Sequence, residues 1–406
     1  MNLTRRQFLH NVAVLSAVGV APRFLTAAAE ETVNAIQGFK DDRILVVVQL
    51  GGGNDGINTV VPYGDDTYYR MRPKLGLKGD QLLRLNDYAA LHGKMRGFME
   101  LYDAGKLGII QGVGYPNPNR SHFRSMEILH TATDSEIYSG TGWIGRYFDN
   151  TCSGEARPQA GVAIAAERPQ AFDSERGYGI STLNPAKFGW DAGKSVDTEA
   201  NFKALNQPNP TDNSTLDFLR HTSTNALMSS HEVQEAARKG QVEELARGRG
   251  KLNQLAMIAG LIRGGLATRI YYVDTSGFDT HANQLGAHEN LLGTVSKLLS
   301  EFQAQLESDG TADRVTTLVF SEFGRRVQEN GSGGTDHGTA APMFLMGKHI
   351  KPGLHGAYPS LTDLDDGDLK FTTDFRAVYA SILNQWFDTD PTKIIQGNFA
   401  SLPLLA

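Results

Sequence analysis

The chain alternates short apolar runs with longer segments of helical periodicity. An unbroken apolar run at residues 44–50 ends in three glycines and predicts a strand buried on both faces. Similar runs predict strands at 107–113, 162–165, 269–273, 315–320 and 343–346. Between them, helical patterns predict helices at 94–103, 121–131, 252–262, 283–306 and 374–386. We therefore expect an α/β fold of three layers, with a mostly parallel sheet flanked by helices.

The first 29 residues have the pattern of an export signal. Arg5 and Arg6 precede a weakly hydrophobic run at 12–20, and a cluster of small residues follows at 27–29. A charged region, a short apolar region and a small-residue cleavage site in this order are typical of a secretory signal peptide. The paired arginines favour the twin-arginine route, which exports folded proteins. A short basic N-terminal helix is the alternative interpretation.

This signal sets expectations for location and partners. The apolar run is too short to span a bilayer, which takes roughly 20 apolar residues, and no later segment is apolar enough. We expect a periplasmic or secreted protein that meets the twin-arginine translocation machinery and has no stable membrane span. Residues 30–406 are expected to form one domain, in which the polar, helix-prone stretch at about 197–251 is a helical insertion.

Composition narrows the classes of partner. The formal net charge is −6, and no basic block follows the signal, so nucleic acid is not an expected partner. Cys152 is the only cysteine, which excludes an intramolecular disulfide even in an oxidising compartment. No His or Asn signature surrounds Cys152, and this disfavours a cysteine nucleophile.

The clearest chemistry lies directly after the predicted strands, because ligands bind in such folds at the carboxyl ends of strands. The glycine turn 51–56 follows the first strand and formally matches a dinucleotide fingerprint. An extended segment rather than a helix follows it, which argues against that interpretation. The alternative is that the glycines allow a tight turn that directs Asp55 across the strand ends as a metal ligand. Asn54 and Asp55 are also common turn formers.

The second predicted strand leads to a helix that begins with polar residues. Ser121 at such a helix start is either a simple N-cap or a nucleophile whose alkoxide the helix N-terminus stabilises. Arg120 and His122 flank it as groups for anion binding or proton transfer. The Gly-x-Ser-x-Gly elbow of α/β-hydrolases is absent from the sequence.

Two later connections add carboxylates and histidines. Asp279 and His281 follow the strand at 269–273 and are plausible metal ligands, with Asp274 as a partner that orients His281. A solvated loop with one capping aspartate is the alternative. Glu322 and Arg325 follow the strand at 315–320.

The glycine-rich loop that comes next contains Asp336 and His337, whose polar side chains have little role in packing a core. Together these clusters predict a divalent metal site, with Zn, Mg, Mn or Ca as the ion. An adjacent serine fits hydrolysis or transfer of a phosphate or sulfate ester.

The chain resembles the domain of unknown function 1501 (DUF1501) family over nearly all of its length after the signal. The segments that support the resemblance are 50–63, 120–123, 277–284, 321–325, 334–338 and 372–379. This family is grouped by resemblance with the alkaline phosphatase and sulfatase superfamily of metal-dependent hydrolases. The resemblance implies an alkaline-phosphatase-like fold and a metal-assisted reaction on a small anionic ester or a polysaccharide.

The resemblance also implies roles for single residues. Carried over by order, Asp55 matches the metal-binding aspartate of the first strand and Ser121 the nucleophile position. Asp279 and His281 match a later Asp/His pair, and His337 matches the late histidine.

The chain departs from the superfamily where Ser-Asp-His-Gly is replaced by Ser-Glu-Phe-Gly at 321–324. Glu322 can replace the aspartate, but Phe323 cannot bind a metal, so one metal site is lost unless Asp336 compensates. Two functions follow: an exported ester hydrolase with Ser121 as nucleophile and Arg120 and Arg325 holding the anion, or a non-catalytic binding or accessory protein on the same fold.

Overall fold

We describe the protein from a computed structural model. The described residues are 39–153, 157–189, 201, 204–206, 214–246 and 253–405. The expected signal at 1–29 and part of the expected insertion at 197–251 lie outside them. Within them, no helix has the length and apolar character needed to cross a bilayer.

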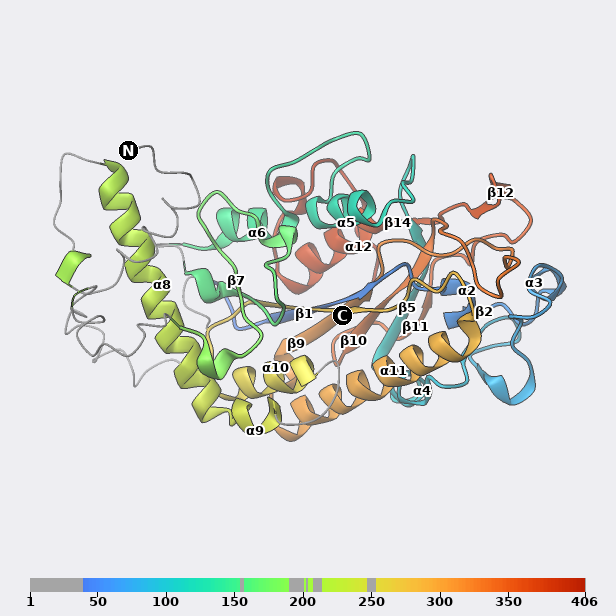
Figure 1. Cartoon of the computed structure of the whole chain (residues 1–406), viewed down its shortest axis with the longest axis horizontal. Helices are drawn as coiled ribbons and strands as arrows, with labels where there is room; N and C mark the ends of the chain where they lie inside the picture. The colour runs from blue at the N-terminus through green and yellow to red at the C-terminus, as the bar shows by residue number, and fades with distance from the viewer. Residues whose placement is uncertain are drawn as a thin grey trace.

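The described residues are organised around a nine-stranded sheet with β1 (Ile44–Gly51) near its centre (Figure 1). β1 pairs in parallel with β8 on one side and β9 on the other. All its residues up to Val48 are buried, as expected for a strand covered on both faces. In spatial order the strands are β11 (Gly353–His355), β5 (Leu107–Gly114), β10 (Ala341–Gly347), β9 (Val315–Phe320), β1, β8 (Ile270–Ser276), β6 (Gly161–Ala163) and β7 (Ile180–Ser181), and β14 (Thr373–Asp374) pairs with β5.

One strand breaks the parallel arrangement. β10 runs antiparallel to both β9 and β5. The connection from β9 to β10, residues 321–340, therefore begins and ends at the same edge of the sheet. This edge is also where β1, β8 and β5 end, so the antiparallel return keeps the glycine-rich loop beside the other strand ends.

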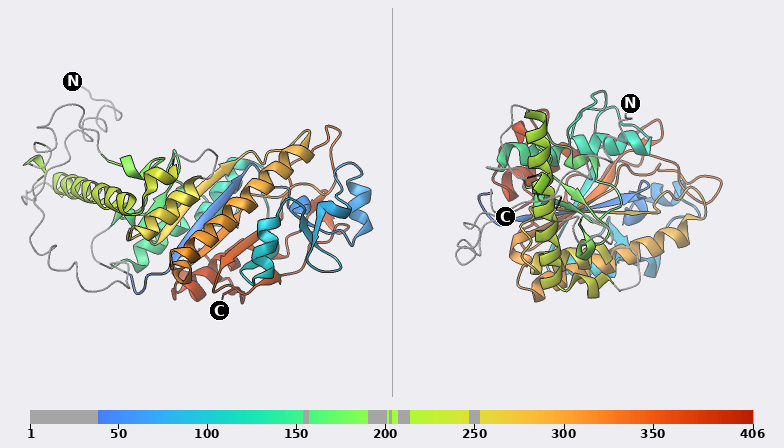
Figure 2. Two further views of the ribbon diagram at one scale, coloured as in Figure 1. Left: turned by 90° about the horizontal axis from the view of Figure 1, so that it is seen from below. Right: turned by 60° about the vertical axis from the view of Figure 1, so that its left-hand side comes forward.

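Helices cover both faces of the sheet (Figures 1 and 2). Alternation along β1 separates two cores: Val46 and Val48 pack in one, and Leu45 and Val47 in the other. The first face is covered by α4 (Arg96–Asp103), α10 (Asn253–Arg263) and α11 (Gln284–Ser308), and the second by α5 (His122–Thr131), α6 (Trp143–Thr151) and α12 (Phe375–Ser381). The expected three-layer α/β architecture is confirmed.

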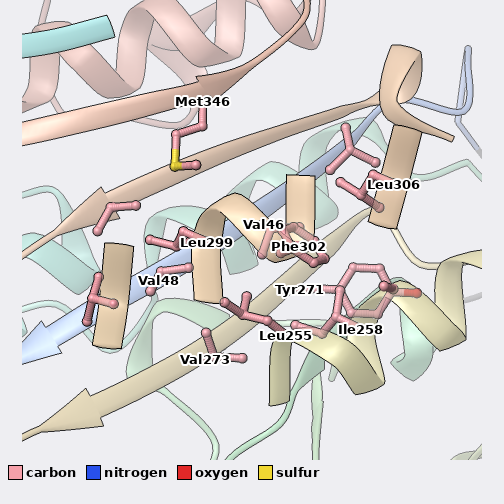
Figure 3. Close-up of a cluster of buried hydrophobic side chains, with 14 of the residues drawn as sticks. Val46, Val48, Leu255, Ile258, Tyr271, Val273, Leu299, Phe302, Leu306 and Met346 are labelled. Carbon is pink, nitrogen blue, oxygen red and sulfur yellow. The ribbon is translucent and has the colours of Figure 1, made fainter. Parts of the chain in front are cut away.

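Figure 3 shows how the first core is filled. Leu255 and Ile258 of α10, together with Leu299 of α11, pack against Val48 of β1 and Tyr271 of β8. Each of these side chains is at most about 1% exposed, and full burial of one such side chain stabilises the fold by about 1.5–3 kcal/mol. The sheet edge that bears the polar connections is therefore supported by a closely packed apolar core.

Further helices and short strands surround this framework. α8 (Ser214–Lys239) and α9 (Val242–Ala246) fall within the stretch expected as a helical insertion, and α8 projects from one end of the molecule in Figure 1. The helix expected at 374–386 is α12 followed by a π-helix at Ile382–Trp386. The remaining α-helices and strands of the described residues are α2 (Gly56–Thr59), β2 (Val60–Val61), α3 (Asp66–Met71), β3 (Leu82–Arg84), β4 (Ala90–His92), β12 (Leu364–Asp365) and β13 (Asp368–Leu369). Short 3-10 helices lie at η2 (Gly79–Gln81), η3 (Pro158–Ala160), η4 (Gln170–Phe172), η5 (Pro185–Lys187), η6 (Ala312–Arg314) and η8 (Pro391–Lys393).

Candidate metal centre

Polar side chains from three separate connections meet at the carboxyl edge of the sheet. His122 is the first residue of α5, after β5. Asp279 and His281 lie between β8 and α11, and His337 lies between β9 and β10. One ligand atom of His122, one of Asp279 and one of His337 all lie within 4.8 Å of one another. A group of this size and composition is able to share one metal ion.

Glu322 fixes the orientation of His122. Its Oε1 lies 2.7 Å from His122 Nδ1 and also accepts a 2.8 Å hydrogen bond from the backbone N–H of Gly52. The Glu322 side chain is only 2% exposed. Because a carboxylate accepts hydrogen bonds, Nδ1 of His122 is the donor and Nε2 of the neutral ring keeps its lone pair. That Nε2 lies 3.7 Å from Asp279 Oδ2.

His337 is oriented in the same way by a different acceptor. Its Nδ1 lies 2.9 Å from the backbone carbonyl oxygen of Arg120. A carbonyl oxygen can only accept, so the lone pair of neutral His337 is again on Nε2, which lies 3.1 Å from Asp279 Oδ1. Two imidazoles from different connections therefore present Nε2 to one carboxylate.

His281 lies at the rim of this group. Its Nε2 is 3.0 Å from His337 Nε2 and 3.1 Å from Asp279 Oδ1. A hydrogen bond between these nitrogens needs one of them to carry a proton, and a metal ion bound by both would replace that proton. Two nitrogens on a tetrahedral zinc ion with bonds of about 2.0–2.1 Å lie about 3.3 Å apart, close to the spacing found here. Asp336 Oδ1, at 3.3 Å, takes the place at Nδ1 of His281 that we expected for Asp274.

Asp279 is held in its ionised form. Burial by itself would raise the pKa of this carboxyl group, but the hydrogen bond from Arg325 and the positive charge of that guanidinium group outweigh burial and lower the pKa to about 2. The side chain remains 48% exposed. Asp279 is therefore a carboxylate at neutral pH that solvent and small ligands can reach.

The guanidinium group of Arg325 is engaged inside the protein, whereas the sequence-based expectation was that it holds a substrate anion. Its side chain is fully buried and donates to the carbonyl oxygens of Gly52, Gly53, Phe278 and Thr335 as well as to Asp279, 2.7 Å away. Each of its three nitrogens is therefore engaged within the protein. Arg325 therefore connects the glycine turn to the loop of Asp279 and to the loop of His337. Its charge keeps Asp279 ionised.

Asp55 is also placed differently from our expectation. It is fully buried and forms a salt bridge of 2.5 Å with Arg72, which is buried as well. It also accepts a hydrogen bond from Gln284 Nε2 and caps α2 through the backbone N–H of Asn58. Burial would raise the pKa of Asp55, but the charge of Arg72 outweighs it and lowers the pKa. With its charge balanced and no exposure, Asp55 is an internal anchor and not a metal ligand of this cluster.

Ser121 and Arg120 lie beside the cluster. Ser121 is the N-cap of α5, but its side chain makes no capping hydrogen bond and is exposed to solvent. The guanidinium group of Arg120 pairs with Asp366 and Asp368, so it is not free to hold an anion by itself. Arg120 also lines a cavity of about 820 Å³ that adjoins the histidines through Phe323.

The glycine turn and Phe323 fit together closely. Gly53 has a φ of +71°, and a Cβ on it would lie 2.3 Å from the Phe323 ring. The same ring lies 4.9 Å from the ring of His122 and 4.8 Å from that of His337, measured between centroids. Phe323 is 2% exposed. It cannot bind a metal, and instead fixes the spacing of two histidines.

Sequence reasoning missed two residues of this region, Arg72 and Gln284. Arg72 is the C-cap residue directly after α3 and is separated from the strand ends in sequence, so no motif pointed to it. Gln284 is the first residue of α11, at the end of the segment Thr-His-Ala-Asn-Gln. A polar residue is common at a helix start, so nothing in the sequence indicated a role in the site. Only the tertiary structure brings both to Asp55.

Comparison with known proteins identifies the family. Residues 107–397 match the model of the family described as "Protein of unknown function (DUF1501)". This match covers well over half of the chain, which therefore belongs to the DUF1501 family, as the sequence motifs predicted. A search of curated proteins gives no match.

Solved structures similar to this chain share little sequence with it. A lipoteichoic acid synthase, LtaP, from Listeria monocytogenes is 10% identical, with 86% of this chain and 73% of that chain covered and a TM-score of 0.34. A protein in the alkaline phosphatase superfamily from Vibrio parahaemolyticus is 11% identical, with 98% and 80% covered and a TM-score of 0.38. The PsFucS1 sulfatase from Pseudoalteromonas sp. is 9% identical, with 98% and 75% covered and a TM-score of 0.39.

Proposed function

We propose that this DUF1501 protein is a metal-dependent hydrolase of phosphate or sulfate esters, with a single cation bound by His122, Asp279 and His337. One observation supports this most strongly. The Nδ1 atoms of both histidines are held by protein acceptors, so that both Nε2 lone pairs converge on one ionised carboxylate. A hydrogen bond from the other ring nitrogen to a protein acceptor is typical of histidines that bind metals.

The residues suit one transition-metal ion better than two hard ions. Two imidazoles and one carboxylate, with further coordination positions open, form the donor set of many catalytic zinc sites. Imidazole favours ions such as Zn²⁺ over Mg²⁺ and Ca²⁺, which prefer oxygen ligands. Asp55 is engaged with Arg72, and Phe323 cannot bind an ion, so these two positions supply no ligand for a second ion.

The residues around the cluster can each contribute to ester hydrolysis. A cation bound here supplies Lewis-acid polarisation of the ester oxygen. Ser121 is the candidate nucleophile, since its hydroxyl makes no capping hydrogen bond and the N-terminus of α5 favours developing negative charge. Arg325 keeps Asp279 ionised, and Glu322 keeps His122 in the tautomer that leaves Nε2 free. The remainder of the ester would occupy the cavity lined by Arg120.

The second candidate function is a metal-binding but non-catalytic exported protein. Arg120 and Arg325 are both engaged with other partners, which removes two cations that would hold a transferred phosphate or sulfate. This observation favours binding without turnover. The two functions differ in whether Ser121 matters, because a binding protein needs the ligands but not the nucleophile.

The test combines metal analysis with substrate turnover. Protein without bound metal is titrated with Zn²⁺ and Mn²⁺ and assayed on 4-nitrophenyl phosphate and 4-nitrophenyl sulfate. We expect one equivalent of metal bound, and binding lost in Asp279→Asn. We also expect turnover lost in both Asp279→Asn and Ser121→Ala. Asp313→Asn changes an exposed aspartate that pairs with Lys348 just before the start of β9, at the end of that strand opposite to the cluster, and serves as the control.

The possible outcomes separate the two functions. Metal binding without turnover by the native protein would favour the non-catalytic function. A folded native protein that binds neither ion would overturn both.

We further propose that residues 1–29 direct export of the folded protein by the twin-arginine route. Arg5 and Arg6, the apolar run that follows and the small residues at 27–29 support this. Replacing both arginines by lysine keeps the charge but removes the guanidinium pair. We expect the substituted protein to stay in the cytoplasm with its signal uncleaved, measured by fractionation and immunoblotting. Unchanged export would overturn the proposal.

A further inference from the structure

The ligands of the candidate centre come from two loops that are far apart in sequence but joined at one buried point. Thr280 lies between Asp279 and His281, and Thr335 directly precedes Asp336 and His337. Both threonines are buried, although the ligands beside them are partly exposed. The hydroxyl groups of the two threonines therefore point to the interior side of the loops.

Gln284 accepts a hydrogen bond from each of the two hydroxyl groups. Its Oε1 accepts a hydrogen bond of 3.0 Å from Thr280 Oγ1 and one of 2.6 Å from Thr335 Oγ1. Its Nε2 donates to the carboxylate of Asp55. A carboxylate accepts only, so the orientation of the amide group is defined by its partners. The side chain is fully buried, and both its amide oxygen and its amide nitrogen form hydrogen bonds within the protein.

Asp55 gives this amide a fixed point of attachment. The carboxylate is held by Arg72, whose guanidinium group also donates to Asn58 Oδ1 and to the carbonyl oxygens of Arg326 and Val327. The result is a continuous buried path of hydrogen bonds from Arg72 through Asp55 and Gln284 to both ligand loops. Such a path leaves little freedom at its end, because each group has a single satisfied geometry.

The backbones of the two loops are pressed together at the same place. The N–H of Thr335 donates to the carbonyl oxygen of Thr280 at 3.3 Å, and the N–H of Gln284 donates to the carbonyl oxygen of Gly333 at 2.9 Å. A Cβ on Gly334 would lie 2.3 Å from the carbonyl carbon of His281, so no larger residue fits there. The separation of the loops is therefore set within narrow limits.

We propose that Gln284 is a positioning residue of the metal centre, which holds the Asp279–His281 loop and the Asp336–His337 loop at the spacing a shared cation requires. This inference rests on the proposed metal site and goes beyond it, since Gln284 touches neither the cation nor the substrate. It also gives Asp55 a role: the carboxylate after the first strand acts on the centre through Gln284.

The test removes one hydrogen bond at a time and measures metal binding directly. Thr335→Val keeps the shape of the side chain but removes the hydroxyl group, and Thr335→Ser restores it. Gln284→Met removes the whole link at similar volume. Gln303→Met is the matched control: Gln303 is a buried glutamine of the same helix, α11, and donates to Glu307, away from the centre.

Two readouts distinguish positioning from general stability. Zn²⁺ affinity is measured by competition with a chelator, and the visible spectrum of the Co²⁺-substituted protein reports the ligand geometry. We expect Thr335→Val and Gln284→Met to weaken Zn²⁺ binding by about 10–100-fold, as loss of an outer-shell partner typically does. The Co²⁺ spectrum should shift in both, while Thr335→Ser and Gln303→Met resemble the native protein.

Each outcome decides the inference. If the native protein binds Zn²⁺ and Thr335→Val binds it with equal affinity and an unchanged Co²⁺ spectrum, the positioning role of Gln284 is wrong while the proposed site stands. If Gln303→Met weakens binding as much as Gln284→Met, the effect is general to α11 and the inference also fails. If the folded native protein binds no metal, the proposed function and this inference fail together. Should Gln284→Met not fold, the Thr335→Val and Thr335→Ser pair decides alone.

Discussion

Two regions of this molecule use the same kinds of residue for opposite purposes. The buried region contains Asp55, Arg72 and His288, and the surface region contains Asp279, Arg325 and His337. In both, an aspartate pairs with a buried arginine. In the buried region, however, the aspartate is fully enclosed, and His288 Nε2 is hydrogen-bonded to Asn54 Oδ1 at 2.9 Å. In the surface region Asp279 stays about half exposed, and histidine nitrogens with lone pairs face it.

The two regions differ in whether their polar groups already have partners inside the protein, and not in residue type. A group whose charge and lone pairs are all used within the protein is an internal anchor, and one that keeps some of them available is a candidate binding site. A buried carboxylate is tolerated only when its charge is compensated. Asp55 meets that condition with Arg72 and Gln284 and has no capacity left for a ligand. Asp279 is compensated on one side by Arg325 and remains open on the other.

The largest effect should come from breaking the buried pair. Arg72→Met leaves the carboxylate of Asp55 enclosed without a counter-charge, and we expect the free energy of unfolding to fall by about 3–5 kcal/mol. Urea unfolding of the metal-free protein measures this. Lys40→Met removes an exposed partner of Asp388 and should leave the midpoint of unfolding unchanged. Equal stability of Arg72→Met and the native protein would show that Asp55 is not an anchor.

The next effect tests the surface region without removing a ligand. Glu322→Gln removes the negative charge behind His122, and we expect Zn²⁺ affinity to fall by about 10–100-fold. Chelator competition measures the affinity. Glu301→Gln, at an exposed position of α11 paired with Lys297, is the control. An unchanged affinity in Glu322→Gln would remove His122 from the ligand set.

Acid should destabilise the protein through its enclosed histidines. Burial lowers the pKa of both His130 and His288 to about 4, against an ordinary value of 6.5. Between pH 6.5 and 4 the unfolded chain binds protons at these positions and the folded protein does not. The free energy of unfolding is therefore fully retained above pH 6.5 and falls as pH drops, by up to about 1.4 kcal/mol per pH unit for each histidine.

His288→Gln isolates one of the two contributions, because glutamine still offers an N–H to Asn54 Oδ1. We expect the slope of unfolding free energy against pH, measured by urea unfolding between pH 4.5 and 6.5, to fall by about one proton. Above pH 7 the variant and the native protein should have parallel profiles. A slope that is the same in both over the acid range would show that His288 is protonated in the folded state.

The smallest effect on stability is expected at Ser121. Its side chain is exposed and makes no capping hydrogen bond, so Ser121→Ala should change the free energy of unfolding by less than about 0.5 kcal/mol. Thermal and urea unfolding measure this. A larger loss would mean that Ser121 stabilises α5, and any loss of turnover in Ser121→Ala would then have a structural cause.

The sequence was sufficient for the architecture and for part of the site. The strand expected at 315–320 coincides with β9, and β1 and β5 each extend one residue beyond the runs that predicted them. These runs are buried on both faces, where apolar pattern and structure correspond most directly. The apolar pattern of the sequence did not reveal that β10 is antiparallel, because a short buried strand has the same pattern whether it is parallel or antiparallel to its neighbours.

For the site, the rule that polar residues gather at strand ends correctly grouped His122, Asp279, Glu322 and His337. It did not show that the side chains of Asp55 and Arg325 are buried, because it cannot tell which side of a connection a side chain faces. Asp55 turns inward to Arg72, a residue that no pattern linked to the strand ends. Compensation of charge is a property of the tertiary structure.

The three candidate ligands come from three separate connections, and this has a consequence for the stage at which a cation could bind. His122, Asp279 and His337 are distant in the chain and meet only when the sheet has formed. An unfolded chain lacks such a site, so a bound cation would stabilise only the native state, by an amount that grows with its free concentration. Filling the site then depends on where folding is completed. If the protein is exported as proposed, a chain folded in the cytoplasm would take its ion from the cytoplasmic pool, and a chain folded after export from the pool outside.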